Sequence, residues 1–202
     1  MDIVVAACND TTTIKEIKKI LESHEGTTLT VYEKCGSKDY ENIPLENVGR
    51  EQHTFAHHIA NNYDSLSDTI ICTAGNFDKH PSRRKFLMDA LADKTSDFVC
   101  NDNYVDQPRT LAGHTNFKID HYGGRLKPAN PRPLSKWSEQ HIGAFDPKKS
   151  SCYEGMFKAS SSSIRKRPQE DYMHIAKELS TDNNAEAVHY MERLQSMLYD
   201  PN

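Results

Sequence analysis

The sequence predicts an α/β domain with a mostly parallel central sheet flanked by helices. Short apolar runs, such as residues 3–8 and 69–74, alternate along the chain with stretches whose apolar residues recur at helical spacing. Nearly continuous apolar runs of this length are typical of strands that helices cover on both faces. A second strand at residues 28–32 follows the first helix, and such a strand-helix-strand unit implies parallel strands joined by a right-handed crossover.

The first hundred residues supply most of the regular elements. The predicted elements, in order, are a strand at 3–8, a helix through 14–21 that ends before 26, a strand at 28–32, a loop at 42–50, a helix at 51–63, a strand at 69–74, a helix opened by Pro81 and a fourth strand at 97–100. Residues 9–13 read Asn-Asp-Thr-Thr-Thr and supply capping residues for the first helix. In the helix after Pro81, four apolar side chains are expected to face the core, namely Phe86, Leu87, Ala90 and Leu91.

Residues 101–150 differ from the rest of the chain. They are rich in Pro, Gly, Asn and His and weakly periodic, which predicts hairpins and long loops with one short helix near Trp137. Residues 153–159 are expected to return to the sheet, and helices follow at 169–179 and 185–199. We expect residues 1–202 to form one domain, which is compatible with its being the N-terminal module of a longer polypeptide.

Composition narrows the function classes. The net charge of −4 argues against nucleic-acid binding through a basic face. No signal peptide opens the chain, and no apolar run is long enough to span a membrane. The five cysteines are odd in number and widely spaced, which predicts reduced thiols in a cytoplasmic protein, with Cys8, Cys72 and Cys100 as small buried side chains.

Polar residues follow each of the first three predicted strands. Asn9 comes after the first strand, directly behind Ala7 and Cys8, and Glu33 comes after the second. Asn76 opens the segment after the third. Each of these three residues could instead simply stabilise a turn. Because ligands of open α/β sheets bind beyond the carboxyl ends of the strands, we expect these groups to converge on one site.

A divalent-cation site is predicted after the third strand. Asn76, Asp78 and His80 alternate there, and in an extended segment alternate side chains point the same way. Carboxylate and amide oxygens suit Mg²⁺ or Mn²⁺, which would neutralise a bound diphosphate. With only one carboxylate, this predicted site offers few ligands to a metal ion.

An anion site is predicted where Gly49 and Arg50 enter the next helix. Backbone N–H groups at a helix start favour an anion, and arginine adds a charge-assisted bond to phosphate. His53 lies one turn into that helix, and His53 with His57 forms an i, i+4 pair. That pair leaves open a zinc-dependent hydrolase, although no third ligand is evident.

Three further acidic residues are candidates for acid–base chemistry. Asp120 lies in the irregular segment, where a hairpin turn is the competing interpretation. Glu154 precedes Gly155 at the predicted return to the sheet. Glu192 neighbours Arg193 in the last helix and is expected to form a structural ion pair.

The block at residues 47–68 carries a resemblance. It reads N-V-G-R-E-Q-H-T-F-A-H-H-I-A-N-N-Y-D-S-L-S-D, and it resembles the hallmark N-V-G-R-E-x-H-T-[YF]-x-x-H-I, followed by Y-D-x-L, of a family of glycosyltransferase-like proteins. In that family a strand ends in Q-G-N with a histidine shortly after; here residues 74–76 read A-G-N and His80 follows. The chain also resembles the N-terminal GT-A domains of glycosyltransferases from large algal viruses that modify the capsid protein.

The resemblance implies a GT-A-like fold and a function. It implies a UDP-sugar donor, an Mn²⁺ or Mg²⁺ ion, a glycan or glycoprotein acceptor such as a viral capsid protein, and retention of anomeric configuration. Residues 101–150 would lie on the acceptor side. The residues expected to bind the nucleotide, sugar, diphosphate or metal, or to act in catalysis, are Ala7, Cys8, Asn9, Glu33, Gly49, Arg50, His53, Asn76, Asp78, His80, Asp120 and Glu154.

The chain departs from the GT-A pattern at one position. GT-A enzymes hold their metal with D-x-D, and the matching residues here are Asn76-Phe77-Asp78, so the first carboxylate is missing. Metal use is therefore in doubt. The departure leaves a second hypothesis, a nucleotide-sugar-binding module that has lost catalysis, beside the metal-dependent hydrolase built on His53 and His57.

Overall fold

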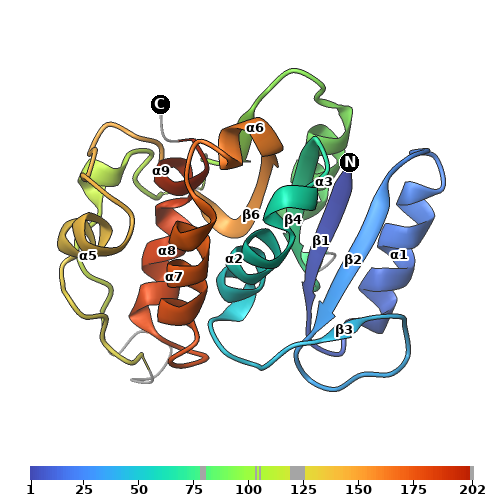
Figure 1. The fold of residues 1–202 in the computed structure, drawn as a ribbon, viewed down its shortest axis with the longest axis horizontal. Helices are drawn as coiled ribbons and strands as arrows, with labels where there is room; N and C mark the ends of the chain where they lie inside the picture. Colours follow the sequence, from blue (N-terminus) through green and yellow to red (C-terminus); the bar gives the residue numbers. More distant parts are fainter. Residues whose placement is uncertain (78–80, 103, 105, 119–125, 201–202) are drawn as a thin grey trace.

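The central sheet has six strands in the order β3-β2-β1-β4-β6-β5 (Figure 1). The computed structural model describes residues 1–77, 81–102, 104, 106–118 and 126–200. Strands β1, β2, β3 and β4 run parallel, whereas β6 is antiparallel to both β4 and β5. The strands are β1 (Asp2–Ala7), β2 (Thr28–Glu33), β3 (Ile43–Pro44), β4 (Thr69–Ala74), β5 (Phe98–Asn101) and β6 (Tyr153–Ser160). The predicted α/β class with a mostly parallel sheet is confirmed.

Helices cover both faces of this sheet. On one face, α1 (Thr11–Leu21) and α3 (Pro81–Ala92) pack on alternate residues of β1, including Ile3 and Val5. On the other face, α2 (Arg50–Asn62) packs against α7 (Gln169–Leu179), and α8 (Glu186–Arg193) and α9 (Gln195–Tyr199) join them (Figure 1). Because both faces are covered, β1 is apolar along nearly its whole length.

The first half of the chain follows the sequence prediction closely. Strand β4 has the predicted bounds, and α1 and α2 lie where helices are predicted. Helix α3 begins at Pro81 and buries the four predicted side chains, Phe86, Leu87, Ala90 and Leu91. The two-residue strand β3 lies inside the segment predicted as a loop, where it pairs with the end of β2.

The second half differs more. The predicted helix at 185–199 is two helices, α8 and α9, because Leu194 leaves the helical range at φ −90° and ψ 7°. Helix α5 (Leu134–His141) contains Trp137 as predicted, and a short 3₁₀ turn covers Leu111–Gly113. The serine tract after β6 forms α6 (Ser161–Ile164), where Ser160 accepts a capping hydrogen bond from the backbone of Ser163.

The prediction that the cysteines are reduced is wrong for four of the five. Cys8 is bonded to Cys35, and Cys100 to Cys152, while Cys72 is a buried free thiol as predicted. Cys8 is exposed and Cys100 half-buried. Spacing in the sequence does not reveal which strands become neighbours. Cys8 and Cys35 follow the paired strands β1 and β2, which brings their Cα atoms to 4.8 Å. The cysteine pattern therefore no longer supports a cytoplasmic location.

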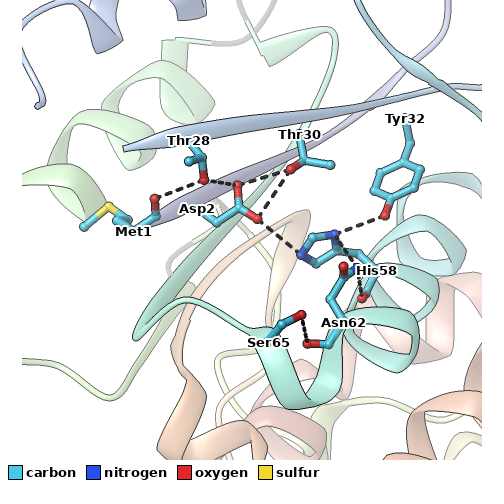
Figure 2. Close-up of polar contacts among 8 residues, drawn as sticks. All are labelled: Met1, Asp2, Thr28, Thr30, Tyr32, His58, Asn62 and Ser65. Carbon is cyan, nitrogen blue, oxygen red and sulfur yellow. Dashed lines mark hydrogen bonds and ion pairs between the residues drawn. The ribbon is translucent and has the colours of Figure 1, made fainter. Parts of the chain in front are cut away.

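A closed polar network lies at the amino ends of the parallel strands (Figure 2). The Asp2 carboxylate accepts hydrogen bonds from Thr28 Oγ1 at 2.9 Å and Thr30 Oγ1 at 3.3 Å, and lies 3.4 Å from His58 Nε2. The other ring nitrogen of His58 is 3.2 Å from the Tyr32 hydroxyl. Asp2, Tyr32 and His58 are all buried, so this network ties β1 and β2 to α2.

Among the residues that the structure describes, no helix combines the length and the apolar character needed to cross a bilayer.

Candidate functional site

A cleft of about 270 Å³ opens at the carboxyl ends of β1 and β4. We call it the carboxyl-end cleft. Its lining includes Ala7, Cys8, Lys34, Arg50, Gly75 and Asn76. The end of β1, the residue after β2, the start of α2 and the residues after β4 therefore meet at one edge of the sheet. Of the predicted site residues, Ala7, Cys8, Arg50 and Asn76 are brought together here.

Small residues form the floor of the cleft. A Cβ on Gly75 would lie 2.4 Å from Asp10 Oδ2 and 2.8 Å from the Cα of Ala7, so only glycine allows this approach. The Asp10 carboxylate accepts a hydrogen bond from the backbone of Cys8 at 2.8 Å. Asp10, in the stretch predicted to supply capping residues, is the N-cap residue of α1, but its side chain makes no capping hydrogen bond. Its side chain instead orders the turn at the cleft.

Lys34 and Arg50 place two cationic side chains in the lining. Lys34 Nζ donates to the backbone carbonyls of Val48 and Arg50, the latter at 2.5 Å. Burial lowers the pKa of Lys34 to about 8, although Glu51 and Glu46 raise it. Arg50 Nη2 donates to Asn184 Oδ1 at 2.5 Å. Both cations lie at the entrance to α2, where they can bond to a phosphate, and the carboxylates of Asp10 and Glu51 share the lining with them.

The start of α2 has an unusual backbone. Gly49 and Arg50 both have positive φ, at 58° and 46°. A Cβ on Gly49 would lie 2.4 Å from the Leu179 carbonyl oxygen, so glycine is required for the contact with α7. No side chain caps the helix start. The first N–H groups of α2 therefore have no capping side chain beside the cleft.

Three of the predicted site residues have strained backbones. Among the described residues, positive φ at non-glycine positions occurs at Asn9, Arg50, Asp106 and Glu154. Such conformations cost free energy and concentrate at functional sites. The first two border or line the carboxyl-end cleft, and Glu154 lies in the neighbouring cleft described below.

Glu33 and Asn9 support the site from behind. Glu33 is buried, and its carboxylate accepts hydrogen bonds from the backbone N–H groups of Asn9 at 3.3 Å and Cys35 at 2.7 Å, and from the Tyr40 hydroxyl. These bonds, with the disulfide between Cys8 and Cys35, fix the loops after β1 and β2 to each other. Neither Glu33 nor Asn9 is part of the cleft lining.

His53 lies behind the cleft rather than in it. Its ring is buried in α2, and Nδ1 has no hydrogen-bond partner among the described residues. Burial lowers the pKa of His53 to about 4, with further lowering by Lys34 and His57. The ring centroids of His53 and His57 are 5.9 Å apart. Within the described part of the chain, no group of three His, Cys, Asp or Glu residues could hold a metal ion, so the zinc hypothesis gains no third ligand.

Arg83 connects the carboxyl-end cleft to a second cleft of about 500 Å³, which we call the β6 cleft. Arg83 Nη1 donates to Asn76 Oδ1, and Arg83 Nε lies 4.0 Å from Glu154 Oε1. Both Arg83 and Glu154 line the β6 cleft. Glu154 also accepts hydrogen bonds from Ser82 Oγ at 2.7 Å and Asn101 Nδ2 at 2.8 Å. The two clefts therefore share one hydrogen-bonded boundary.

Glu192 is a second carboxylate of the β6 cleft. It lies 2.9 Å from Arg193 Nη1, so the predicted ion pair is present. Burial raises the pKa of Glu192, and the positive charge of Arg193 lowers it by less than burial raises it. Glu51, on the lining of the carboxyl-end cleft, adds to the upward shift. Its side chain lies against Gly155 of β6.

Sequence reasoning missed Arg83 and Glu51. The sequence does indicate that both are special, because each is a charged residue on the same helix face as buried apolar side chains. Arg83 precedes Leu87 by four residues in α3, and Glu51 precedes Phe55 by four in α2. Arg83 and Glu51 each lie in the first turn of their helix, on the face that packs on the sheet. A charged side chain at such a position lies close to the end of the sheet, where ligands bind.

Asp78, His80 and Asp120 lie outside the described residues. Their predicted roles in metal binding and catalysis therefore stay predictions. Asn76 Oδ1 is engaged by Arg83, and the Asp10 carboxylate by the backbone of Cys8. The described residues of the cleft do not by themselves form a metal site.

A larger hollow of about 750 Å³ lies between α3 and β5. It flanks an antiparallel edge strand and does not include the carboxyl ends of the parallel strands. Binding sites of open α/β sheets form at those carboxyl ends, so the smaller clefts are the better candidates.

No protein-family model matches the sequence, and no curated protein sequence matches it. Among solved structures, the chain is similar to the galactosyltransferase LgtC in complex with donor and acceptor sugar analogs, at 10% identity and a TM-score of 0.34, over 96% of this chain and 71% of that one. An active-site mutant of LgtC is similar at 11% identity and a TM-score of 0.34, over 96% and 70%. Both similarities are weak, and the site described above stands on the geometry of this chain alone.

Proposed function

We propose that this chain is a glycosyltransferase of GT-A type that binds a UDP-sugar with its diphosphate in the carboxyl-end cleft. One observation carries the proposal. Lys34, after β2, and Arg50, at the start of α2, meet at a cleft floored by small residues where the parallel strands end. The resemblance of residues 47–68 to a glycosyltransferase-like family is independent support, since Gly49 and Arg50 belong to that block.

The proposed chemistry is transfer of the sugar to an acceptor hydroxyl. The bond between the anomeric carbon and the diphosphate oxygen breaks, and its electron pair stays on the diphosphate. Charge grows on that leaving group, so Lys34 and Arg50 stabilise the transition state if they contact it. The acceptor oxygen forms the new bond and releases its proton.

A carboxylate of the β6 cleft is proposed to take that proton. Glu154 was the sequence candidate, but both of its oxygens accept hydrogen bonds from Ser82 and Asn101. Glu192 is the second candidate. It is paired with Arg193, but burial raises its pKa, and a general base works best when its pKa approaches the working pH.

We further propose that Asp78, with Asn76 and His80, holds Mn²⁺ or Mg²⁺ beside the diphosphate. Asp78 and His80 are outside the described residues, so the support is their place directly after β4. A divalent cation would supply positive charge to the leaving diphosphate. Retention of anomeric configuration is proposed from the sequence resemblance only, and it requires the acceptor oxygen to attack from the face that the diphosphate leaves. A capsid-protein acceptor is likewise proposed from the resemblance only.

The second candidate function is a UDP-sugar-binding module without transferase activity. It is favoured by the residue at the first D-x-D position, Asn76, whose side-chain oxygen is engaged by Arg83 instead of being directed to a metal.

Calorimetry with UDP, with and without Mn²⁺, tests the proposal. Wild type is expected to bind UDP more tightly with Mn²⁺, and Asp78→Ala is expected to lose that gain. Asp64→Ala, an exposed aspartate in the 3₁₀ turn after α2, is the matched control and should keep it. Equal tight binding by wild type and Asp78→Ala rules out the metal role, and absence of UDP binding by wild type rules out the function. Turnover of a UDP-sugar panel then separates an enzyme from a binding module.

A further inference from the structure

The β6 cleft lies between the start of β6, the end of α8 and residues from the irregular segment. At about 500 Å³ it is almost twice the volume of the carboxyl-end cleft. A volume of this size accommodates a small ligand such as one or two sugar rings.

An aromatic pair forms one wall. Tyr153 is 2% exposed, its hydroxyl donates to the Pro108 carbonyl, and the guanidinium of Arg193 lies 4.3 Å from its ring centroid. Tyr104 stacks on Tyr153 with centroids 5.5 Å apart and an interplanar angle of 20°. Tyr104 is 44% exposed, and it is one of four large hydrophobic side chains that are exposed in the described part of the chain. A fixed ring thus supports an open ring at the rim of the cleft.

Both carboxylates in the lining are paired with arginines. Arg83 faces Glu154 at 4.0 Å, and Arg193 faces Glu192 at 2.9 Å. The amide side chains of Gln107 and Asn116 also line the cleft, as do Lys118 and His189. Paired charges, amide side chains and an aromatic wall suit a hydroxyl-rich ligand with one apolar face.

We propose that the β6 cleft is the acceptor site and binds a neutral pyranose of a glycan, with the apolar face of the sugar stacked on Tyr104. The assignment of the sugar as the acceptor rests on the proposed glycosyltransferase function. The shared boundary of Asn76, Arg83 and Glu154 places this sugar next to the carboxyl-end cleft. Glu192 lines the same cleft.

Saturation-transfer NMR with a panel of neutral methyl pyranosides tests the site on the full chain. Wild type is expected to saturate the ring protons of at least one glycoside. Tyr104→Ala should weaken that binding about fivefold, because a lost stacking contact is worth about 1 kcal/mol. Tyr104→Phe keeps the ring and should bind as wild type does. Met88→Ala, which removes a comparably exposed side chain of α3 that does not line this cleft, should also bind normally.

Two outcomes overturn the proposal: wild type binds none of the glycosides at millimolar concentration, or Tyr104→Ala binds them as well as wild type. UDP calorimetry on the same variants keeps the two proposals distinguishable. If UDP fails to bind while the glycoside signal depends on Tyr104, the glycosyltransferase function is lost and the sugar site stands. If UDP binds and the glycoside signal is insensitive to Tyr104, the sugar site is lost instead.

Discussion

The two ends of the parallel strands use polar residues in opposite ways. At the amino ends, Thr28, Thr30 and His58 each bond to Asp2 (Figure 2). Asp2, Thr30 and His58 also border a small cavity of about 170 Å³. At the carboxyl ends, the cations of Lys34 and Arg50 line an open cleft. Helix α2 contributes to both ends, since Arg50 begins it and His58 lies in its last two turns.

The difference lies in where the bonding partners come from. The amino-end partners are on neighbouring strands and the helix directly above them, so they close on each other. The carboxyl-end groups bond to loops, such as Arg50 to Asn184 between α7 and α8, and space remains between them. A self-contained polar network indicates a structural role, whereas polar groups held apart around a space indicate a site.

Breaking the covalent link at the carboxyl ends should have the largest effect on stability. Cys8→Ser with Cys35→Ser removes a bond that joins residues 27 apart, and is expected to lower the free energy of unfolding by about 3 kcal/mol. Urea unfolding followed by circular dichroism measures this. Reductant should destabilise wild type at least as much, since it also opens the bond between Cys100 and Cys152. A double variant as stable as wild type would show that the Glu33 hydrogen bonds alone hold these loops.

Breaking the amino-end network should cost somewhat less. Asp2→Ala leaves Thr28, Thr30 and His58 without their shared acceptor, and the expected loss is about 2 kcal/mol in the free energy of unfolding. Asp2→Asn keeps one acceptor oxygen and should lose about half as much. Glu25→Ala, in the exposed turn after α1, is the control for removing an acidic side chain. UDP binding by folded Asp2→Ala should match wild type; a marked loss of UDP binding would contradict the division of roles between the two ends.

The pH dependence of stability sharpens the comparison within α2. The folded pKa of His53 is about 4, below the ordinary value near 6.5, so the unfolded chain binds the proton more readily between those values. Stability from neutral His53 is therefore complete above about pH 6.5 and is lost as pH falls towards 4. Between pH 7 and pH 5 the expected loss is about 2 kcal/mol, measured by urea unfolding at each pH.

His53→Gln should remove that part of the pH dependence, and His24→Gln, after α1, serves as the control. Because burial also lowers the pKa of His114 to about 4, some dependence should remain in His53→Gln. An unchanged slope in His53→Gln would mean that the His53 ring is not held neutral by burial.

How far the sequence predicted this molecule depends on the range of the contacts involved. Strand β4 and helix α3 were predicted well because a buried strand and a one-sided helix show their environment in the local pattern. The antiparallel direction of β6 was not predicted, because the direction of a strand depends on the course of the preceding loops and not on the sequence of residues 153–159 itself. The break at Leu194 was missed for a similar reason, since apolar spacing continues across it.

The site was predicted from the positions of the strand ends. That prediction was wrong where loop conformations and long-range contacts decide which way a side chain points. Strand ends placed Ala7, Cys8 and Asn76 at one edge of the sheet, and the structure brings them together. Glu33 was expected to face the ligand, but its carboxylate turns to the backbone of Asn9 and Cys35, which only the loop conformations decide. The disulfide partner of Cys8 likewise depends on strand neighbours that spacing cannot reveal.

Removing Arg50 should have the smallest effect on stability and a large effect on binding. Arg50 is half-buried and bonds to Asn184 near the surface, so Arg50→Ala is expected to change the free energy of unfolding by less than about 1 kcal/mol. A lost charge-assisted bond to phosphate should nonetheless weaken UDP binding by about tenfold or more. Arg165→Ala is the matched control, because Arg165 donates to the backbone carbonyls of Tyr63 and Asp64 and lines neither cleft. Calorimetry at low and high salt completes the comparison. The loss of UDP affinity in Arg50→Ala should shrink as salt screens the charge. An equal loss of UDP affinity in both arginine variants would mean that Arg50 acts through the fold and not on the phosphate.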